Sequence, residues 1–348
     1  MSTLEKPAPR ADLPAARFRA TSYDVAKRAG VSQSAVSRCF RQGASIAPAT
    51  KIKIMEAARE LGYRPNAIAS GLITKRSNMV AVLISTQARL YYPEVLAQLT
   101  QTLSAQDMRV LLFDLKTEGD VEAALQQVWR YWVDGAIVAA HLTAAQIRAF
   151  DDHHVPIVLY NRSGEGEVVS SVFCDSVAGE RVLLDALLSA GHRHFGIITG
   201  PNDSYTGRQR VETAKLLINE AGFGPPLVAE GTFDYGSGTR GLHQLMEASG
   251  GKLDAVVCAN DLMAIGAIDA ARLEMGLKVP DDLSIVGFDG AGAASWIGYQ
   301  VTTIQQPVER MCRAAVAMLM ERIEAPETAS EVRTFPGKFI PGTSARIA

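Results

Sequence analysis

Short runs of apolar, mostly β-branched residues recur between residues 79 and 288, and stretches with helical spacing separate them. These runs are MVAVLIS (79–85), RVLLFDL (109–115), GAIVAA (135–140), PIVLY (156–160), HFGIIT (194–199), DAVVCA (254–259) and LSIVGF (283–288). Strands without polar alternation are buried on both faces, and the intervening helices allow parallel pairing. The pattern therefore predicts two doubly wound α/β subdomains that divide near residues 160–190, with a cleft between them.

The first 76 residues differ from this α/β body in charge and in pattern. They contain 14 Lys and Arg against 5 Asp and Glu, whereas the remainder contains 21 against 32. A basic head on an acidic body suggests that only the head meets a polyanion. Residues 1–20 are rich in Pro, Ala and Arg and are expected to be a disordered tail. They lack the apolar segment of a secretion signal.

Three short helices are expected after this tail. Thr21 or Ser22 can cap the first, Ser32 can cap the second, and Pro48 suits the first turn of the third. Such short helices must pack on one another to be stable. Residues 65–76 follow as a weakly helical linker.

The segment TSYDVAKRAGVSQSAVSRCF (21–40) has the spacing of a helix-turn-helix. Ala26 is small where the two helices would cross, Gly30 provides the turn, and Val31 and Val36 anchor the second helix. An outward-facing polar set on that helix suits base edges and phosphates: Ser32, Gln33, Ser34, Ser37 and Arg38. The alternative is a helical hairpin with a solvated polar face, and the basic charge of this region favours DNA.

Polar and aromatic side chains follow the expected strands, at the sheet edge where α/β proteins bind ligands. Asn161 follows PIVLY, Asn260 and Asp261 follow DAVVCA, and Asp289 follows LSIVGF. Aromatic rings combined with Asn, Asp, Arg and Gln suit a neutral or weakly anionic polyhydroxylated ligand, because each buried hydroxyl needs a donor and an acceptor. Asn260 and Asp261 could instead cap the helix that follows them.

Other motifs carry weaker signals. GSGTRG (236–241) matches the glycine pattern of dinucleotide sites, but no acidic residue follows about 20 positions later, so a flexible helix start is favoured. Two close pairs of histidines, His153 with His154 and His192 with His194, lack metal-ligand spacing. The cysteines form no CxxC pair: Cys39, Cys174, Cys258 and Cys312. We expect no metal, no cofactor and no catalytic constellation.

The chain resembles the lactose/galactose repressor (LacI/GalR) family through YDVAKRAGVSQSAVSR (23–38) and ARELGYRPNAIASGL (58–72). GHRHFGIITGP (191–201), PDDLSIVGFD (280–289) and TTIQQP (302–307) continue the resemblance. It covers residues 21 to about 342. It implies an all-α helix-turn-helix domain at 21–64, a hinge helix or linker at 65–76, and a periplasmic-binding-protein-like body at 77–348 for effector binding and dimerisation.

The resemblance also implies roles for individual residues. Gln33, Ser34 and Arg38 occupy the main base-reading positions. Asn66, Ala69 and Leu72 lie in the hinge that contacts DNA, with Leu72 as an apolar wedge in the minor groove. Eight residues are expected to touch the effector: Tyr91, Tyr92, Asn161, Arg210, Phe233, Asn260, Asp289 and Gln306.

The sequence thus predicts a sequence-specific DNA-binding transcriptional regulator, controlled by a small carbohydrate-like effector and acting as a homodimer on a pseudo-palindromic operator. Family resemblance favours repression over activation, and the effector could weaken or strengthen DNA binding. A cytoplasmic solute-binding protein or a sugar-acting enzyme are the alternatives. No apolar stretch approaches the roughly 18 residues of a membrane span, so we expect a cytoplasmic protein.

Overall fold

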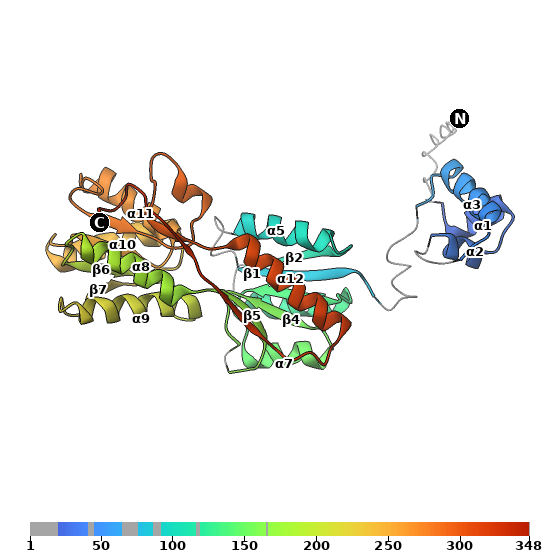
Figure 1. Ribbon diagram of the computed structural model, residues 1–348, viewed down its shortest axis with the longest axis horizontal. Coiled ribbons are helices and arrows are strands. Elements are labelled where there is room, and N and C mark those ends of the chain that lie inside the picture. Colours follow the sequence, from blue (N-terminus) through green and yellow to red (C-terminus); the bar gives the residue numbers. More distant parts are fainter. Residues whose placement is uncertain are drawn as a thin grey trace, which may run out of the picture. The chain divides into compact units, whose positions relative to one another are not determined.

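The computed structural model describes residues 20–40, 45–64, 76–85, 92–115, 119–164 and 166–347. The expected tail lies outside these residues except for Ala20, and the expected linker lies outside them except for Arg76. The chain divides into two compact units, Met1–Arg76 and Ser77–Ala348, which are described separately (Figure 1).

The first unit contains three helices within its described residues: α1 (Ser22–Ala29), α2 (Gln33–Cys39) and α3 (Pro48–Glu60). Thr21 caps α1 through a reciprocal bond with Asp24, and the Ser32 hydroxyl accepts the Ala35 N–H at the start of α2. Gly30 ends α1 in a left-handed conformation with φ 65°. The caps and the turn predicted from the sequence are therefore confirmed. A small core joins the helices: Val25, Ala26, Val36, Ile54, Ala57 and Ala58.

The second unit contains two parallel sheets. The N-terminal subdomain has a six-stranded sheet in the order β11-β5-β4-β3-β1-β2, with every pair parallel. Its strands are β1 (Met79–Ser85), β2 (Arg109–Leu115), β3 (Gly135–Ala139), β4 (Ile157–Tyr160), β5 (Ser170–Cys174) and β11 (Val332–Phe335). Helices α5 (Tyr92–Ser104) and α12 (Val308–Glu324) cover one face, and α6 (Gly119–Arg130) and α7 (Ala144–Asp152) cover the other (Figure 1).

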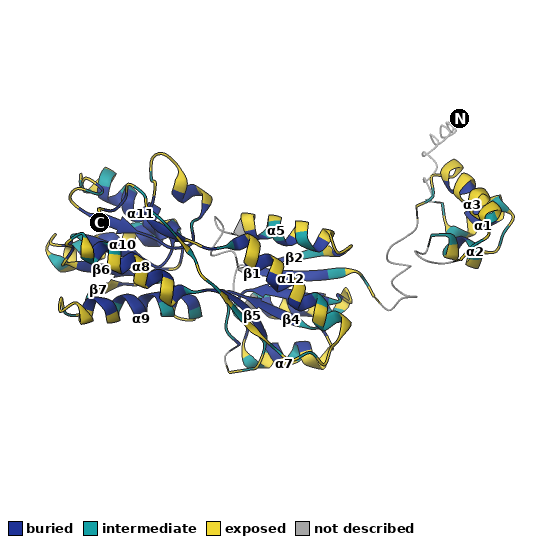
Figure 2. Cartoon of the chain, viewed as in Figure 1, coloured by how far each residue is buried: buried dark blue, intermediate teal, exposed yellow. Residues whose placement is uncertain are grey.

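The C-terminal subdomain has a four-stranded parallel sheet in the order β7-β6-β8-β9 and a two-stranded antiparallel sheet of β10 and β12. These strands are β6 (Phe195–Ile198), β7 (Leu227–Ala229), β8 (Ala255–Cys258), β9 (Ser284–Val286), β10 (Thr303–Gln305) and β12 (Lys338–Ile340). The helices are α8 (Ser176–Ser189), α9 (Tyr205–Glu220), α10 (Tyr235–Ser249) and α11 (Asp261–Asp269), which continues as a π-helical turn over Ala270–Glu274. The central strands are buried, and exposed residues lie on the outer surfaces of the helices (Figure 2). The predicted fold class is confirmed.

The chain crosses between the subdomains three times. It crosses first after β5, inside the predicted 160–190 region, and it returns from β10 to α12 and crosses again from β11 to β12. The return is visible in Figure 1, where red segments from the end of the chain lie among the cyan and green elements of the N-terminal subdomain. Local sequence patterns do not foresee this return, because pairing of β11 with β5 joins residues far apart in the chain.

The glycines of GSGTRG lie within α10, and Gly238 packs closely against α11. A Cβ at Gly238 would lie 2.1 Å from the backbone oxygen of Met263, and one at Gly266 would lie 2.1 Å from that of Tyr235. These glycines therefore allow α10 and α11 to approach closely. The motif lies in the first turns of α10, which Asp234 caps, so the helix start predicted from the sequence is confirmed.

Candidate DNA-binding and effector sites

Helix α2 presents the polar face expected of a recognition helix. Val36 is its buried residue, while Ser32, Ser34 and Arg38 are exposed. Gln33 and Ser37 are half-buried. An exposed guanidinium beside short hydroxyl side chains can donate to base edges and phosphates.

The start of α1 lies beside the start of α2. Gln33 Nε2 donates to the Ser22 hydroxyl at 3.2 Å, which joins the first turns of the two helices. Helix N-termini carry partial positive charge and favour phosphate. Tyr23, in the same first turn of α1, is 72% exposed. Ser22 and Tyr23 are not among the DNA contacts predicted from the sequence, although their position in this first turn could have suggested them.

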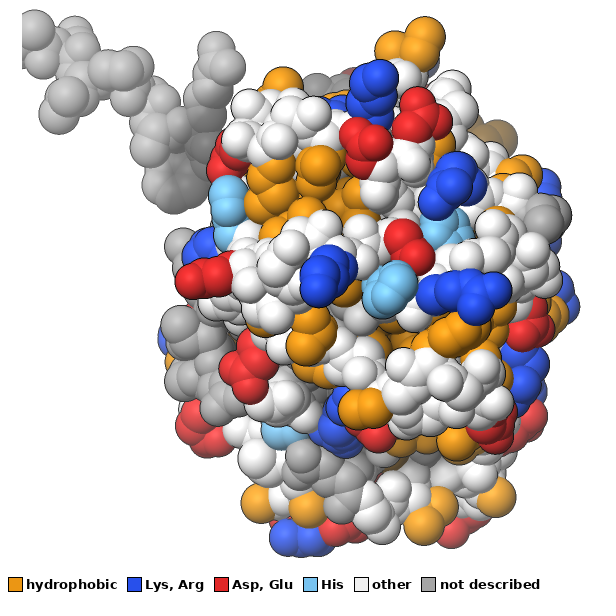
Figure 3. Space-filling model, turned by 90° about the vertical axis from the view of Figure 1, so that its left-hand side faces the viewer, with side chains coloured by type: hydrophobic (Ala, Val, Ile, Leu, Met, Phe, Trp, Pro, Cys, Tyr) orange, Lys and Arg blue, Asp and Glu red, His pale blue; other side chains and the backbone are white. Residues whose placement is uncertain are grey.

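One end of the second unit carries a mixture of charges. At the end of this unit seen in Figure 3, Lys and Arg side chains lie among Asp, Glu and His side chains and hydrophobic groups. This face offers no continuous basic surface, and the basic excess of the chain lies in residues 1–76. The charge distribution therefore favours the first unit for contact with DNA.

Four of the eight expected effector residues form one hydrogen-bonded chain. Arg210 Nη2 lies 3.1 Å from Asp289 Oδ1, which also accepts a 2.6 Å bond from Gln306 Nε2. Gln306 Oε1 accepts a 2.8 Å bond from Asn161 Nδ2. All four residues are buried. We call these four residues the polar cluster.

The polar cluster joins the two subdomains. Asn161 follows β4 of the N-terminal subdomain, Arg210 lies on α9 and Asp289 follows β9 of the C-terminal subdomain, and Gln306 lies in the crossover from β10 to α12. Asn161 and Asp289 have positive φ angles of 51° and 119°. Such backbone strain in residues other than glycine concentrates at functional sites.

Arg210 has further partners that the sequence analysis missed. Its Nη1 donates to Ala259 O at 2.6 Å, and its Nε donates to the Ser176 hydroxyl at 3.5 Å. Its guanidinium carbon lies 3.7 Å from the centre of the Phe288 ring, a cation–π contact. Phe288 directly precedes Asp289, so its position could have suggested it, whereas no local pattern indicates Ser176.

Phe233 and Asn260 lie near this site but make protein contacts. Asn260 caps α11 by accepting the Met263 N–H at 3.0 Å, and its Nδ2 donates to Phe233 O at 3.1 Å. The Phe233 ring packs against the backbone of Gly200, where a Cβ would lie 2.3 Å from it. The helix cap considered for Asn260 is therefore present in this structure.

Asn66, Ala69, Leu72 and Tyr91 lie outside the described residues, and so does the side chain of Tyr92.

The polar cluster lies in a region rich in buried carboxyl groups. Burial raises the pKa of Asp289, and Arg210 opposes this effect. Burial, together with the neighbouring charge of Asp289, raises the pKa of Asp261 to about 8. Glu180 on α8 is 1% exposed, its Oε1 has no hydrogen-bond partner, and burial raises its pKa to about 8 against the opposing effect of Arg210. Nothing in the sequence pattern marks Glu180.

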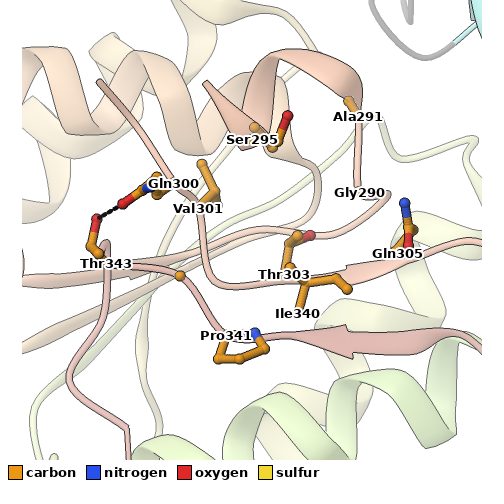
Figure 4. A pocket seen from close by; sticks show the side chains of 12 residues that line it. Gly290, Ala291, Ser295, Gln300, Val301, Thr303, Gln305, Ile340, Pro341 and Thr343 are labelled. Carbon is orange, nitrogen blue, oxygen red and sulfur yellow. Dashed lines mark hydrogen bonds between the residues drawn. The ribbon is translucent and has the colours of Figure 1, made fainter. Parts of the chain in front are cut away.

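Two cavities in the C-terminal subdomain are lined by other residues. One, of about 470 Å³, lies between the 290–305 segment and β12 (Figure 4). Its lining includes Gly290 and Gln305, the chain neighbours of Asp289 and Gln306. The other, of about 630 Å³, lies at the carboxyl ends of β6 and β7.

Neither cavity includes a residue of the polar cluster. The cluster concentrates buried polar groups at the junction of the subdomains. Among the described residues, no group of three or more His, Cys, Asp or Glu is arranged to hold a metal ion. In the same part of the chain, no helix has both the length and the apolar character needed to span a membrane.

The chain combines a basic helix-turn-helix unit with a two-subdomain α/β unit that has buried polar groups at the subdomain junction. This combination defines a DNA-binding transcriptional regulator controlled by a small effector. The family model for bacterial regulatory proteins of the lacI family matches residues 21–66, and that for a periplasmic binding protein-like domain matches residues 184–345. The chain belongs to the LacI family. Members of this family are regulators and not enzymes, so the enzyme alternative is rejected.

Similar proteins match over most of their length. The transcriptional repressor PurR of Serratia proteamaculans is 30% identical over 92% of this chain and 95% of its own. The regulator CelR of Thermobifida fusca is 31% identical over 91% of this chain and 95% of its own.

Solved structures of LacI-family regulators are similar to this chain. A lac repressor dimer bound to operator and the anti-inducer ONPF has a TM-score of 0.85 at 26% identity, covering 95% of this chain and all of that one (100%). A complex of CelR with cellobiose has a TM-score of 0.71 at 28% identity, covering 94% of this chain and 100% of that one.

Proposed function

We propose that this chain represses transcription by binding a pseudo-palindromic operator as a homodimer, and that a carbohydrate-like effector bound at the polar cluster controls this binding. The observation that carries the proposal is the buried chain from Arg210 to Asn161, which links the two subdomains through side chains able to pair with hydroxyl groups. A ligand that competes for these bonds alters the junction of the subdomains, and so couples the effector to the rest of the protein.

The effector class follows from the chemistry of the polar cluster. Arg210 and the amide nitrogens donate, while Asp289 and the amide oxygens accept, so the cluster can satisfy both the proton and the lone pairs of a buried hydroxyl. The similar CelR structure is titled as a complex with cellobiose, which supports a sugar or a sugar derivative. Tyr91, Tyr92, Phe233 and Asn260 complete the proposed contact set.

The DNA contacts follow the organisation expected from the sequence. Residues 21–64 form the DNA-binding domain, 65–76 the hinge, and 77–348 the effector and dimerisation domain, after a tail at 1–20. Arg38 and its neighbours on α2 contact the major groove. Asn66, Ala69 and Leu72 contact the minor groove, where Leu72 is wedged between base pairs.

Dimerisation is supported by apolar side chains that face solvent in the single chain. Leu273, Trp296 and Ile297 are 80%, 61% and 93% exposed. Arg272 donates to Gly298 O, so the turn that carries Leu273 lies beside the 296–298 segment. Large exposed apolar groups of this kind favour association with a second copy. The similar lac repressor structure is titled as a dimer.

The proposed location is the cytoplasm, where the DNA is. The four cysteines are free, and three of them are buried. Unpaired thiols are compatible with a reducing compartment.

The test is selection of bound sequences from a random duplex library by the full-length protein, with and without pooled sugars and sugar acids. A recovered palindrome whose enrichment changes with one pool supports the proposal, and the direction of change tells whether the effector weakens or strengthens binding. Absence of any enriched sequence in all conditions contradicts it. A non-palindromic site contradicts the dimer.

A further inference from the structure

The boundary between the two units falls between Arg76 and Ser77, and one carboxylate holds the residues just after it. Asp134 Oδ1 accepts the backbone N–H of Ser77 at 2.8 Å and its hydroxyl at 3.1 Å. Asp134 Oδ2 accepts the backbone N–H of Asn78 at 2.9 Å. Both carboxylate oxygens are therefore used on the first two residues of the second unit.

Further hydrogen bonds hold residues 77–79, the segment that Asp134 binds. The Ser77 hydroxyl also accepts the Met79 N–H at 3.2 Å, and Asp134 N donates to Met79 O at 2.8 Å. Asn78 has a positive φ of 53°, a conformation that Asn tolerates and that these bonds maintain. The direction in which the chain enters β1 is thus set by Asp134.

Asp134 itself is held by the core of the N-terminal subdomain. It directly precedes β3, which is buried throughout and lies between β1 and β4 in the sheet. A Cβ at Gly135 would lie 2.8 Å from a side-chain carbon of Leu319, so the start of β3 packs tightly against α12.

The polar cluster and Asp134 lie at opposite ends of the strands of the same sheet. Asn161 follows the carboxyl end of β4, whereas Asp134 precedes the amino end of the adjacent parallel strand β3. A packed sheet moves as one body. A change in subdomain orientation at the Asn161 edge therefore moves the Asp134 edge and the residues that it holds.

We propose that Asp134 is a positioning residue that fixes the end of the linker to the N-terminal subdomain and so passes that subdomain's orientation to the DNA-binding unit. This inference rests on the proposed function, since it names the contact through which the effector-binding unit acts on the linker. Removing the carboxylate frees residues 77 and 78 and weakens the coupling while the two binding sites stay intact.

The C-terminal subdomain contains a matched control. Asp254 precedes β8 and accepts the backbone N–H groups of Arg193 and His194, which precede β6, at 3.0–3.1 Å. Asp254 N donates to His194 O at 3.0 Å, as Asp134 N does to Met79 O. The two aspartates hold equivalent turns in the two sheets, and only the Asp134 turn adjoins the linker. Asp254→Ala therefore removes the same kind of contact without touching the linker.

The first experiment needs neither operator nor effector. Full-length wild type, Asp134→Ala and Asp254→Ala are digested briefly with trypsin, and mass spectrometry measures the fragment that begins at Ser77. Arg76 is exposed, and a protease needs the residues after the cleaved bond to leave their native contacts. We expect Asp134→Ala to accelerate this cleavage about tenfold or more, because charged hydrogen bonds are lost, and Asp254→Ala to leave it within about twofold.

Equal cleavage rates for Asp134→Ala and wild type would overturn the inference, and so would equal acceleration by both variants. Asp134→Asn keeps the shape of the side chain, so it tests the same contact if the alanine variant folds poorly. It should accelerate the cleavage to a smaller extent. Circular dichroism checks the fold of each variant.

The second experiment measures coupling on the duplex recovered by selection with wild type. Asp134→Ala should bring the ratio of duplex affinities with and without the active sugar pool close to one, whereas Asp254→Ala keeps the wild-type ratio. A wild-type ratio in Asp134→Ala would overturn the inference even if cleavage is accelerated. If selection recovers no duplex, the proposed function fails, while the digestion still decides whether Asp134 holds the linker.

Discussion

Arg210 Nη2 lies 3.1 Å from Asp289 Oδ1, and the two side chains retain only 5% and 11% of their exposed surface. An ion pair this deeply buried contributes to stability only while both partners remain. Because Arg210 lies on α9 and Asp289 follows β9, the pair also joins two separate elements of the C-terminal subdomain at the point where Gln306 crosses toward the N-terminal subdomain.

Replacing Asp289 with Ala should leave the Arg210 charge buried with fewer partners. We expect the free energy of unfolding to fall by about 3–5 kcal/mol, measured by urea denaturation of the full-length protein. The control is Glu212→Ala, which breaks the exposed 2.9 Å pair with Lys215 and should change stability little. Similar losses in the two variants would contradict the structural role of the buried pair.

Glu180 predicts a dependence of stability on pH. Its pKa is about 8 in the folded protein against the ordinary value of 4.5, because burial disfavours the charged form. The folded state therefore holds a proton that the unfolded state releases above its own pKa. Stability should fall as pH rises from about 5 to 8, by up to about 1.4 kcal/mol per pH unit, and level off above.

Glu180→Gln should reduce this loss of stability. At about pH 8.5 the variant should therefore be more stable than wild type, and the difference should become smaller toward pH 5. Part of the slope should persist, because burial also raises the pKa of Asp261 to about 8. Thermal unfolding across this pH range is the measurement, with Glu212→Gln as an exposed control. Parallel pH profiles of wild type and Glu180→Gln would rule out a buried neutral Glu180.

Arg38 tests the proposed recognition face. Arg38→Ala should weaken binding to the selected duplex by about tenfold to a hundredfold, since a guanidinium that reads a base edge is lost. Arg28→Ala removes one positive charge from the same unit, but Arg28 pairs with Glu60 at 2.7 Å on a different helix surface. Fluorescence anisotropy on the selected and a scrambled duplex separates the two effects. Equal losses for both variants would mean that Arg38 supplies only general charge.

Gly238 tests the close packing of α10 and α11. Gly238→Ala should lower the free energy of unfolding by about 1–3 kcal/mol, because its Cβ would fall on the Met263 backbone, which cannot move aside as a flexible side chain can. Gly292→Ala is the control, since nothing lies within 4 Å of the added Cβ. Denaturant unfolding should show a stability within about 0.5 kcal/mol of wild type for Gly292→Ala.

Much of the candidate site could be placed from the sequence because it follows strand ends. Asn161, Asn260 and Asp289 were expected at the carboxyl edges of strands, and the structure puts them there. Phe288, Ser176 and Glu180 were not foreseen. Phe288 and Ser176 contact Arg210, and the charge of Arg210 acts on Glu180. Arg210 lies on another element, and no periodicity of their own segments encodes such interactions.

The sequence by itself determined the local structure. Thr21, Ser32 and Gly30 act through bonds within a few residues, so capping and turn geometry follow from residue type. Apolar runs likewise determined the buried parallel strands, because burial on both faces requires apolar residues at every position.

Only the tertiary structure decided which distant segments meet. The bond that Asn161 donates to Gln306 joins residues 145 positions apart. The bonds that Asp134 accepts from Ser77 and Asn78 join residues 57 and 56 positions apart. The return of α12 and β11 to the six-stranded sheet is another contact between segments far apart in the chain. Such pairings depend on how whole sheets and helices pack, which is a property of the assembled chain and of no single segment.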